Sequence, residues 1–220
     1  MQGKATVILP ALNELLAITE VVKQVQKAGC GVLVVDNASE DGTGMAAEWA
    51  GAKVIHEPRR GKGFATLAGI KVVETEYVII GDADGTYPLV SSIPHILYLL
   101  GSGYDVVMCS RTCKMPGAMS RRNKVGNWVL TKTASILYGV PIQDLCTGLW
   151  GFKTEFLKSL NVKSVGFTFE AELLVSSVKA KGSIAQLPIV YYPREFGSNS
   201  KLKLKVGFEI LWFLVKESIR

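Results

Sequence analysis

The chain has 220 residues, a formal net charge of +6 and 48% apolar residues. This length suits one domain with a sizeable core, and the apolar share is too high for a disordered chain. No apolar run approaches the roughly 18 residues of a membrane-spanning helix, and the polar start lacks the apolar centre of a signal peptide, so we expect a cytoplasmic protein. The four cysteines lack metal-binding spacing, which argues against zinc.

Short apolar runs alternate with helical stretches through the first half of the chain. Strands are predicted near 5–9, 31–35, 52–56, 77–81 and 105–109, with helices between them. This alternation predicts an α/β fold with a mostly parallel sheet and helices on both faces. Ligands of such sheets bind outside the carboxyl ends of the strands, so polar residues at those ends are candidates for a binding site.

Polar side chains follow the first two predicted strands. Asn13 and Glu14 come after the first strand and its Pro10, and Asp36 ends the second. The alternative for Asn13 and Asp36 is ordinary helix or turn capping.

A glycine-rich segment, Gly61-Lys62-Gly63, precedes another predicted helix. Its glycines allow a nucleotide to approach the backbone closely, and Lys62 offers a compact positive charge. The spacing differs from that of a P-loop, so ATP hydrolysis is not indicated.

The run Asp82-Ala83-Asp84 directly follows an apolar strand. Alternate residues of a strand point to one side, so both carboxylates are expected to face one small volume. Close like charges repel unless a cation lies between them, which favours a hard divalent metal, Mg²⁺ or Mn²⁺. The alternative is an ordinary turn beginning at Asp84-Gly85.

Four motifs occur in the order found in inverting family 2 glycosyltransferases with the GT-A fold, which the chain resembles over nearly its whole length. They are Pro10–Glu14, Asp36–Thr43, Gly61–Gly63 and Asp82–Asp84. The resemblance implies a nucleoside diphosphate sugar as donor. Its base and ribose pocket would be lined by Pro10, Asn13, Glu14 and Asp36, with Lys62, Asp82, Ala83 and Asp84 at the diphosphate and metal, and with Asp84 also catalytic.

The segment from Val106 to Gln143 contains no acidic residue. A patch of one sign attracts phosphates, and the alternative is a solvated basic face. Nucleic acid is not favoured, because interleaved aromatic residues and known motifs are absent. The basic residues are Arg111, Lys114, Arg121, Arg122, Lys124 and Lys132.

Parts of this basic segment resemble the lipid-phosphate site of polyprenyl-phosphate glycosyltransferases, the dolichyl-phosphate mannose synthase group. The motifs are Ser110-Arg111, Ser120–Asn123 and Gly126-Asn127. The resemblance implies that Arg111, Ser120, Arg121 and Arg122 bind the lipid phosphate, and arginines on separate elements can clamp one phosphate. A helix would aim Arg121 and Arg122 about 100° apart, and which of them faces the site stays open.

Gln143–Gly148 and Trp150–Phe152 resemble the next signature of the same group. We place Asp144 in the catalytic centre by this resemblance. A phosphate acceptor is already anionic at pH 7, so positioning should matter more than a strong base. Whether Asp144 is a base or orients the acceptor stays open, and a turn cap is the alternative.

The loop from Tyr192 to Lys201 resembles the group's flexible basic segment. The resemblance implies that Arg194 and Lys201 close over the diphosphate, with Arg194 counted among the catalytic residues because it neutralises the leaving group. A merely basic surface loop is the alternative.

The last stretch, 203–220, has a helical pattern that is apolar over most of its circumference. Such a helix must pack on the domain, on a partner or on a bilayer face. We therefore divide the chain into a catalytic domain, 1–202, and a C-terminal amphipathic helix, 203–220, which is a candidate for membrane-surface contact.

Together these features predict an inverting glycosyltransferase, peripheral at the cytoplasmic membrane face, which moves a UDP- or GDP-linked sugar onto dolichyl or polyprenyl phosphate. A membrane-embedded partner protein is a further partner that the sequence allows. Gly85–Pro88 follows the aspartates where mannosyl-lipid relatives often carry Leu-Gln, so the sugar stays open among mannose, glucose and N-acetylglucosamine. The alternatives are a family 2 transferase acting on a sugar or protein hydroxyl and a non-catalytic nucleotide-sugar or membrane-binding module.

Overall fold

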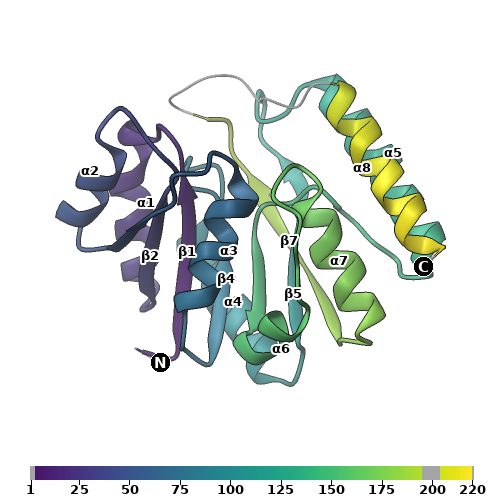
Figure 1. The fold of residues 1–220 in the computed structure, drawn as a ribbon, viewed down its shortest axis with the longest axis horizontal. Helices are drawn as coiled ribbons and strands as arrows, with labels where there is room; N and C mark the ends of the chain where they lie inside the picture. Colours follow the sequence, from purple (N-terminus) through teal and green to yellow (C-terminus); the bar gives the residue numbers. More distant parts are fainter. Residues whose placement is uncertain (1–2, 195–203, 220) are drawn as a thin grey trace.

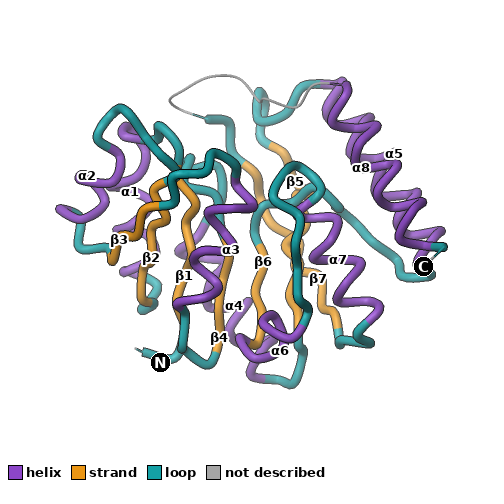
Figure 2. Tube along the Cα trace, viewed as in Figure 1, coloured by secondary structure: helices purple, strands orange, loops and turns teal. Residues whose placement is uncertain are grey.

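The computed structural model describes residues 3–194 and 204–219, which form one mixed sheet with helices on both faces (Figure 1). The seven strands lie side by side in one sheet (Figure 2), in the order β3-β2-β1-β4-β6-β5-β7. Strand β6 runs antiparallel to both neighbours, and the other pairs are parallel. This arrangement confirms the predicted mostly parallel α/β sheet. The strands are β1 (Ala5–Ala11), β2 (Gly31–Asp36), β3 (Lys53–His56), β4 (Tyr77–Ile80), β5 (Val106–Lys114), β6 (Trp150–Lys153) and β7 (Ile184–Tyr191).

The helices fall into two layers because successive strand residues point to opposite faces of the sheet. In β1, Val7 and Leu9 pack under α1, α2 and α4, whereas Ile8 packs in the core beneath α3, α5, α6, α7 and α8. The helices are α1 (Leu15–Lys27), α2 (Thr43–Trp49), α3 (Lys62–Val72), α4 (Leu89–Gly101), α5 (Arg121–Tyr138), α6 (Thr154–Ser159), α7 (Phe169–Lys179) and α8 (Leu204–Ser218).

Two elements differ from the sequence expectation. Strand β5 continues to Lys114, beyond the predicted end at 109, because β7 keeps pairing with it past a register shift between Ser110 and Cys113. The six-residue helix α6 was not predicted, since a single turn and a half carries little periodic pattern.

The C-terminal helix α8 packs on the preceding part of the chain. Val206, Ile210 and Leu214 are buried at helical spacing against the core, and the Tyr138 hydroxyl of α5 donates to the Leu214 carbonyl over 2.8 Å. The sequence allowed this helix to pack on the domain, on a partner or on a bilayer, and one of its faces does pack on the domain. Another face keeps Trp212 71% exposed.

Gly151 of β6 offers a test of the packing between the sheet and α4. A Cβ at this position would overlap the Ile96 side chain. We expect Gly151→Ala to lower the free energy of unfolding by about 1–3 kcal/mol through overpacking, measured by urea denaturation. The control is Gly126→Ala on α5, where a Cβ meets nothing within 4 Å and alanine should be neutral or stabilising by up to about 1 kcal/mol. Equal effects of the two substitutions would contradict this account.

Candidate active site

The loops that follow β2 and β3 are fastened together by Asn37. Its buried side-chain amide donates to the carbonyls of Glu57 and Arg59 over 3.0 and 2.7 Å, and its oxygen accepts from the Gly61 N–H over 2.7 Å. This network fixes the start of α3, and hence Lys62, at the carboxyl edge of the sheet. Sequence reasoning included Asn37 only within a motif and gave it no role of its own.

The residues predicted to line the base and ribose pocket lie at this edge. Asp36 is buried, accepts from the Ser39 N–H over 3.2 Å and faces His56 Nδ1 at 3.1 Å. Asn13 has a positive φ of 56°, and its side-chain oxygen accepts from the Glu40 N–H over 2.9 Å. Hydrogen bonds of this kind are expected if Asn13 and Asp36 act as turn caps, the alternative to nucleotide binding. They shape the loops whether or not a nucleotide binds. Pro10, in β1, is half-buried.

Lys62 bridges two carboxylates. Its Nζ lies 2.7 Å from Asp82 Oδ1 and 2.8 Å from Glu170 Oε1, which is on the first turn of α7. Burial opposes the charge on Lys62, but Asp82 and Glu170 outweigh it and raise the lysine pKa well above its usual value. Burial likewise opposes the charge on Asp82, yet Lys62 holds the pKa of that carboxyl below its usual value. Glu170 was not identified from the sequence.

Arg194 makes a second cation bridge, to the other aspartate of the motif. Its guanidinium lies 2.6 Å from Asp84 Oδ2 and 3.6 Å from Glu14 Oε1. Asp84 is nearly buried, and its other oxygen accepts from both the backbone N–H and the hydroxyl of Thr86 over 3.1 and 2.6 Å. The structure thus brings three of the predicted site residues together, Glu14, Asp84 and Arg194. Lys201, the other basic residue predicted for this loop, lies outside the described residues.

The residues around Asp82 and Asp84 fit a hard divalent cation. Each carboxylate already has a cationic nitrogen within 2.7 Å, from Lys62 at Asp82 and from Arg194 at Asp84. Gly148 leaves room for the Asp82 carboxylate, because a Cβ at that position would overlap it. Across residues 3–194 and 204–219, no cluster of three or more His, Cys, Asp or Glu side chains forms a complete metal site. Two carboxylates with the remaining ligands from phosphate and water match the usual binding of Mg²⁺ beside a nucleotide.

Asp144 and Arg111 form a buried ion pair. Arg111 donates to both carboxylate oxygens through its guanidinium, over 2.7 and 2.8 Å, and through its backbone N–H over 2.9 Å. Asn127 of α5 adds a fourth hydrogen bond of 2.7 Å. Burial alone would raise the pKa of Asp144, but Arg111 outweighs it and lowers that pKa. Four hydrogen bonds therefore hold the Asp144 carboxylate in one position, and its lowered pKa makes it a weak proton acceptor.

Two tyrosines connect this pair to the aspartate motif. The Arg111 guanidinium lies 5.1 Å from the ring centroid of Tyr191, whose ring meets that of Tyr87 edge-on at 5.2 Å. The Tyr87 hydroxyl accepts from the Gly148 N–H over 2.6 Å. The positive charge of Arg111 also helps to lower the pKa of Asp82. Neither tyrosine was identified as a site residue from the sequence.

The other predicted lipid-phosphate residues lie apart from Arg111. Ser120 caps α5 by accepting from the Asn123 N–H over 3.2 Å, and Arg121 and Arg122 are exposed at the start of that helix. Arg121 and Arg122 precede Asn127 by roughly 7.5–9 Å along the helix axis. The structure therefore buries Arg111 against Asp144 and leaves the other two arginines exposed at the start of α5.

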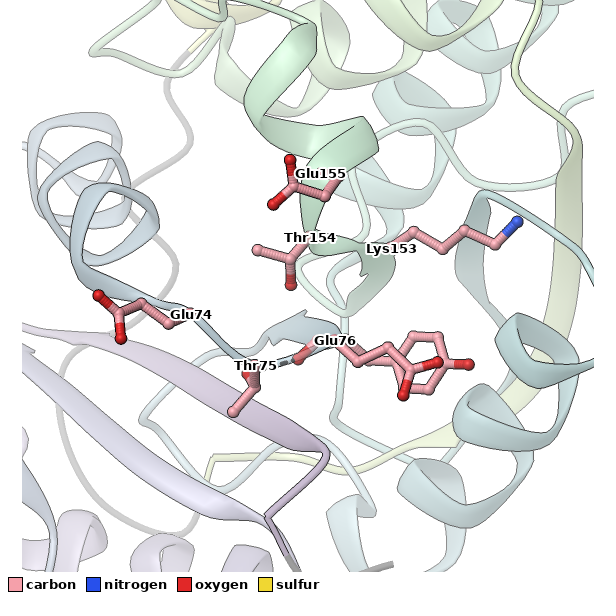
Figure 3. Close-up of a pocket in the computed structure, with 7 residues that line it drawn as sticks. Glu74, Thr75, Glu76, Lys153, Thr154 and Glu155 are labelled. Carbon is pink, nitrogen blue, oxygen red and sulfur yellow. Dashed lines mark hydrogen bonds between the residues drawn. The ribbon is translucent and has the colours of Figure 1, made fainter.

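A separate cavity of about 250 Å³ lies at the opposite edge of the sheet (Figure 3). It is lined by Glu74, Glu76 and Glu155 together with Thr75, Tyr77, Lys153 and Thr154. Three carboxylates repel phosphate, so this cavity does not suit a nucleotide. The phosphate-compatible cations are at the carboxyl edge described above.

Comparison with known proteins identifies the family of the chain. The family model for glycosyl transferase family 2 matches residues 6–160. Glycosyltransferase AglJ of Haloferax volcanii is 34% identical over 89% of this chain and 65% of its own length. A dolichyl-phosphate hexose transferase of the same organism is 32% identical over 97% of this chain and 95% of its own length. Polyprenol monophosphomannose synthase of Mycolicibacterium smegmatis is 30% identical over 88% and 79%, respectively.

The chain spans 65% and 49% of two Haloferax volcanii relatives, AglJ and the hexosyltransferase Agl6. Among solved structures, glucosyl-3-phosphoglycerate synthase of Mycobacterium tuberculosis, in a complex with Mn²⁺ and UDP, superposes with a TM-score of 0.79. That match covers 97% of this chain and 79% of the other at 22% identity, so it bears on the fold alone. The chain belongs to glycosyl transferase family 2 and has the GT-A fold.

Proposed function

We propose that this glycosyltransferase moves a sugar from a nucleoside diphosphate to a dolichyl or polyprenyl phosphate. The observation that carries the proposal is the Arg111–Asp144 pair beside the Asp82-Ala83-Asp84 motif. Asp144 has its oxygens occupied by four donors, which suits an acceptor that arrives already deprotonated. A phosphate is such an acceptor, whereas a sugar or protein hydroxyl needs a base. Two relatives are named for transfer to dolichyl phosphate and for polyprenol monophosphomannose synthesis.

The donor would lie across the loops at the carboxyl edge. Pro10, Asn13, Glu14 and Asp36 are proposed to line the base and ribose pocket, and Ala83 the floor beneath the diphosphate. Asp82 and Asp84 would hold Mg²⁺ or Mn²⁺, which supplies positive charge to the diphosphate when bound.

The reaction would be a single in-line displacement. A phosphate oxygen of the acceptor attacks the anomeric carbon, the bond from that carbon to the donor diphosphate breaks, and the configuration inverts. Arg111 and Asp144 hold the acceptor side, while Arg194 and Lys62 face the departing diphosphate and stabilise its charge. Lys201 is proposed to join them. Arg121, Arg122 and Ser120 would receive the lipid phosphate at the surface, because a single-sign approach raises its local concentration.

We also propose peripheral attachment at the cytoplasmic membrane face through α5 and α8. The two helices pack side by side at one end of the molecule (Figure 1). Each presents exposed apolar side chains at helical spacing, and α5 adds exposed basic residues, as expected of interfacial helices. Within the described residues, no helix combines the length and apolarity needed to cross a bilayer. The exposed apolar residues are Val125, Trp128, Val129, Ile136, Phe208, Trp212, Val215 and Ile219.

The experiment that tests the reaction is transfer from radiolabelled UDP- and GDP-sugars to a short polyprenyl phosphate. We expect label in the lipid phase with Mn²⁺ or Mg²⁺, none with EDTA, and a loss of at least about a hundredfold in Asp84→Asn, because a transition-state charge contact of this kind supplies roughly 2.7–4 kcal/mol. Transfer to a sugar or protein hydroxyl would overturn the acceptor, binding without turnover would favour a non-catalytic module, and a retained anomeric configuration would overturn the mechanism.

The role of Asp144 as the partner of Arg111 is testable through stability. Asp144→Asn leaves Arg111 buried without a carboxylate, and we expect the free energy of unfolding at neutral pH to fall by about 3–5 kcal/mol. The pKa of Asp144 is lowered by folding, so the pair's contribution is complete above the unfolded pKa and disappears as pH falls through the folded pKa. Urea titrations should therefore show the gap between wild type and variant narrowing below about pH 4. A gap that does not change with pH would contradict the ion pair.

Membrane attachment predicts that Trp212 matters and Trp49 does not. Trp212 of α8 is 71% exposed, and Trp49 of α2, at the other end of the molecule, is 84% exposed (Figure 1). In sedimentation with phosphatidylglycerol vesicles, we expect Trp212→Glu to weaken binding about tenfold or more, because insertion of an apolar side chain contributes about 1.5 kcal/mol or more. Trp49→Glu is the matched control and should bind as wild type. Equal loss in both variants would indicate that binding does not use α8.

A further inference from the structure

Lys62 pairs with Asp82 and Arg194 pairs with Asp84, and different elements of the fold position these two cations. Arg194 follows the end of β7 and reaches Asp84 and Glu14 from a loop. Lys62 begins α3, and its second partner, Glu170, lies on the first turn of α7. The position of Lys62 is therefore set by two helices: α3, which carries it, and α7, which carries Glu170. Asp82 pairs with this fixed lysine.

Backbone packing fixes the separation of these two helices at the site. Gly63, the residue after Lys62, lies against the backbone of Ser164 and Val165 so closely that an added Cβ would stand within 2.7 Å of their atoms. Val165 belongs to the segment that leads into α7. The start of α3 and the approach to α7 thus meet without intervening side chains, which places Glu170 within 2.8 Å of Lys62 Nζ.

The charge arrangement has a direct consequence for Asp82. One lysine is shared between two carboxylates, so the group of three keeps one negative charge. If Glu170 were neutral, Lys62 would compensate Asp82 alone, and the pair would attract a divalent cation less strongly. Glu170 side chain is 18% exposed and that of Asp82 27%, so water screens these charges only in part.

We propose that Glu170 is a positioning residue that acts through Lys62: by sharing the positive charge of the lysine, it leaves Asp82 negative enough to bind the metal of the donor complex. This inference rests on the proposed function only in that Asp82 takes a divalent metal; it does not depend on the acceptor. Glu170 has no contact with the acceptor-side pair Arg111 and Asp144 among the bonds described above.

The test is Mn²⁺ binding to the full chain, measured by electron paramagnetic resonance, with Mn²⁺ alone and with UDP or GDP present. We expect Glu170→Gln to raise the Mn²⁺ dissociation constant about tenfold or more, because one nearby charge is lost and Lys62 turns to Asp82. The matched control is Glu172→Gln on the same turn. The Glu172 carboxylate accepts from the backbone N–H groups of Lys163 and Ser164, and glutamine keeps an acceptor there, so Mn²⁺ affinity should stay within about twofold.

A second substitution separates action through Lys62 from a direct effect on the metal. With Mn²⁺ alone, Lys62→Gln should bind the metal at least as tightly as wild type, because a positive charge beside Asp82 is lost. Adding Glu170→Gln to it should change the dissociation constant by less than about threefold. The double variant removes the Lys62–Glu170 pair as a whole, so its comparison with Lys62→Gln remains informative if Glu170→Gln alone unfolds.

Equal losses from Glu170→Gln with and without Lys62 would mean a direct effect on the metal and would overturn the proposal. Unchanged Mn²⁺ affinity in Glu170→Gln, or no Mn²⁺ binding by wild type under any of these conditions, would overturn it as well. The expected binding pattern in a chain that transfers no label to polyprenyl phosphate would support Glu170 and contradict the proposed acceptor instead.

Discussion

The active-site geometry depends on charge compensation between carboxylates and cations at the carboxyl edge of the sheet. Five carboxylates meet three cations there, leaving two negative charges among these groups. One divalent metal ion would neutralise these two negative charges, and a cation between neighbouring carboxylates reduces their repulsion. The groups are Glu14, Asp82, Asp84, Asp144 and Glu170 with Lys62, Arg111 and Arg194.

The antiparallel strand β6 makes this meeting of charges geometrically possible. Strand β4 ends at the carboxyl edge and leads into Asp82, whereas β6 begins at that edge because it runs the opposite way. The segment before β6 therefore carries Asp144 and Gly148 to the aspartate motif. Gly148 accepts this proximity because any side chain would overlap Asp82. A wholly parallel sheet would deliver the same segment to the other edge.

Local pattern was enough to predict the first five strands and to expect Asp36, Asp82 and Asp84 at one edge of the sheet, because adjacent residues define an apolar run and its end. The ion pairs could not be predicted from local pattern. Lys62 and Glu170, for example, are 108 residues apart, and no sequence pattern connects them. Arg111 shows the same limit: the acid-free segment around it predicted a phosphate-attracting patch, but its burial and its pairing with Asp144, 33 residues away, could not be predicted. The extra length of β5 likewise follows from β7, a distant partner.

Helix α5 joins the proposed membrane contact to the acceptor side of the site. Its exposed face includes Trp128, while the adjoining face uses Asn127 and Thr131 to hold the loop around Asp144. Asn127 donates to Asp144, its oxygen accepts from the Cys146 N–H, and Thr131 accepts from the Leu145 N–H. Under the proposed function, a helix seated on the bilayer surface would therefore also fix the carboxylate that orients the lipid phosphate. Because the same rigid element has both tasks, the depth of the helix in the interface would set how far the lipid phosphate must rise to reach Arg111.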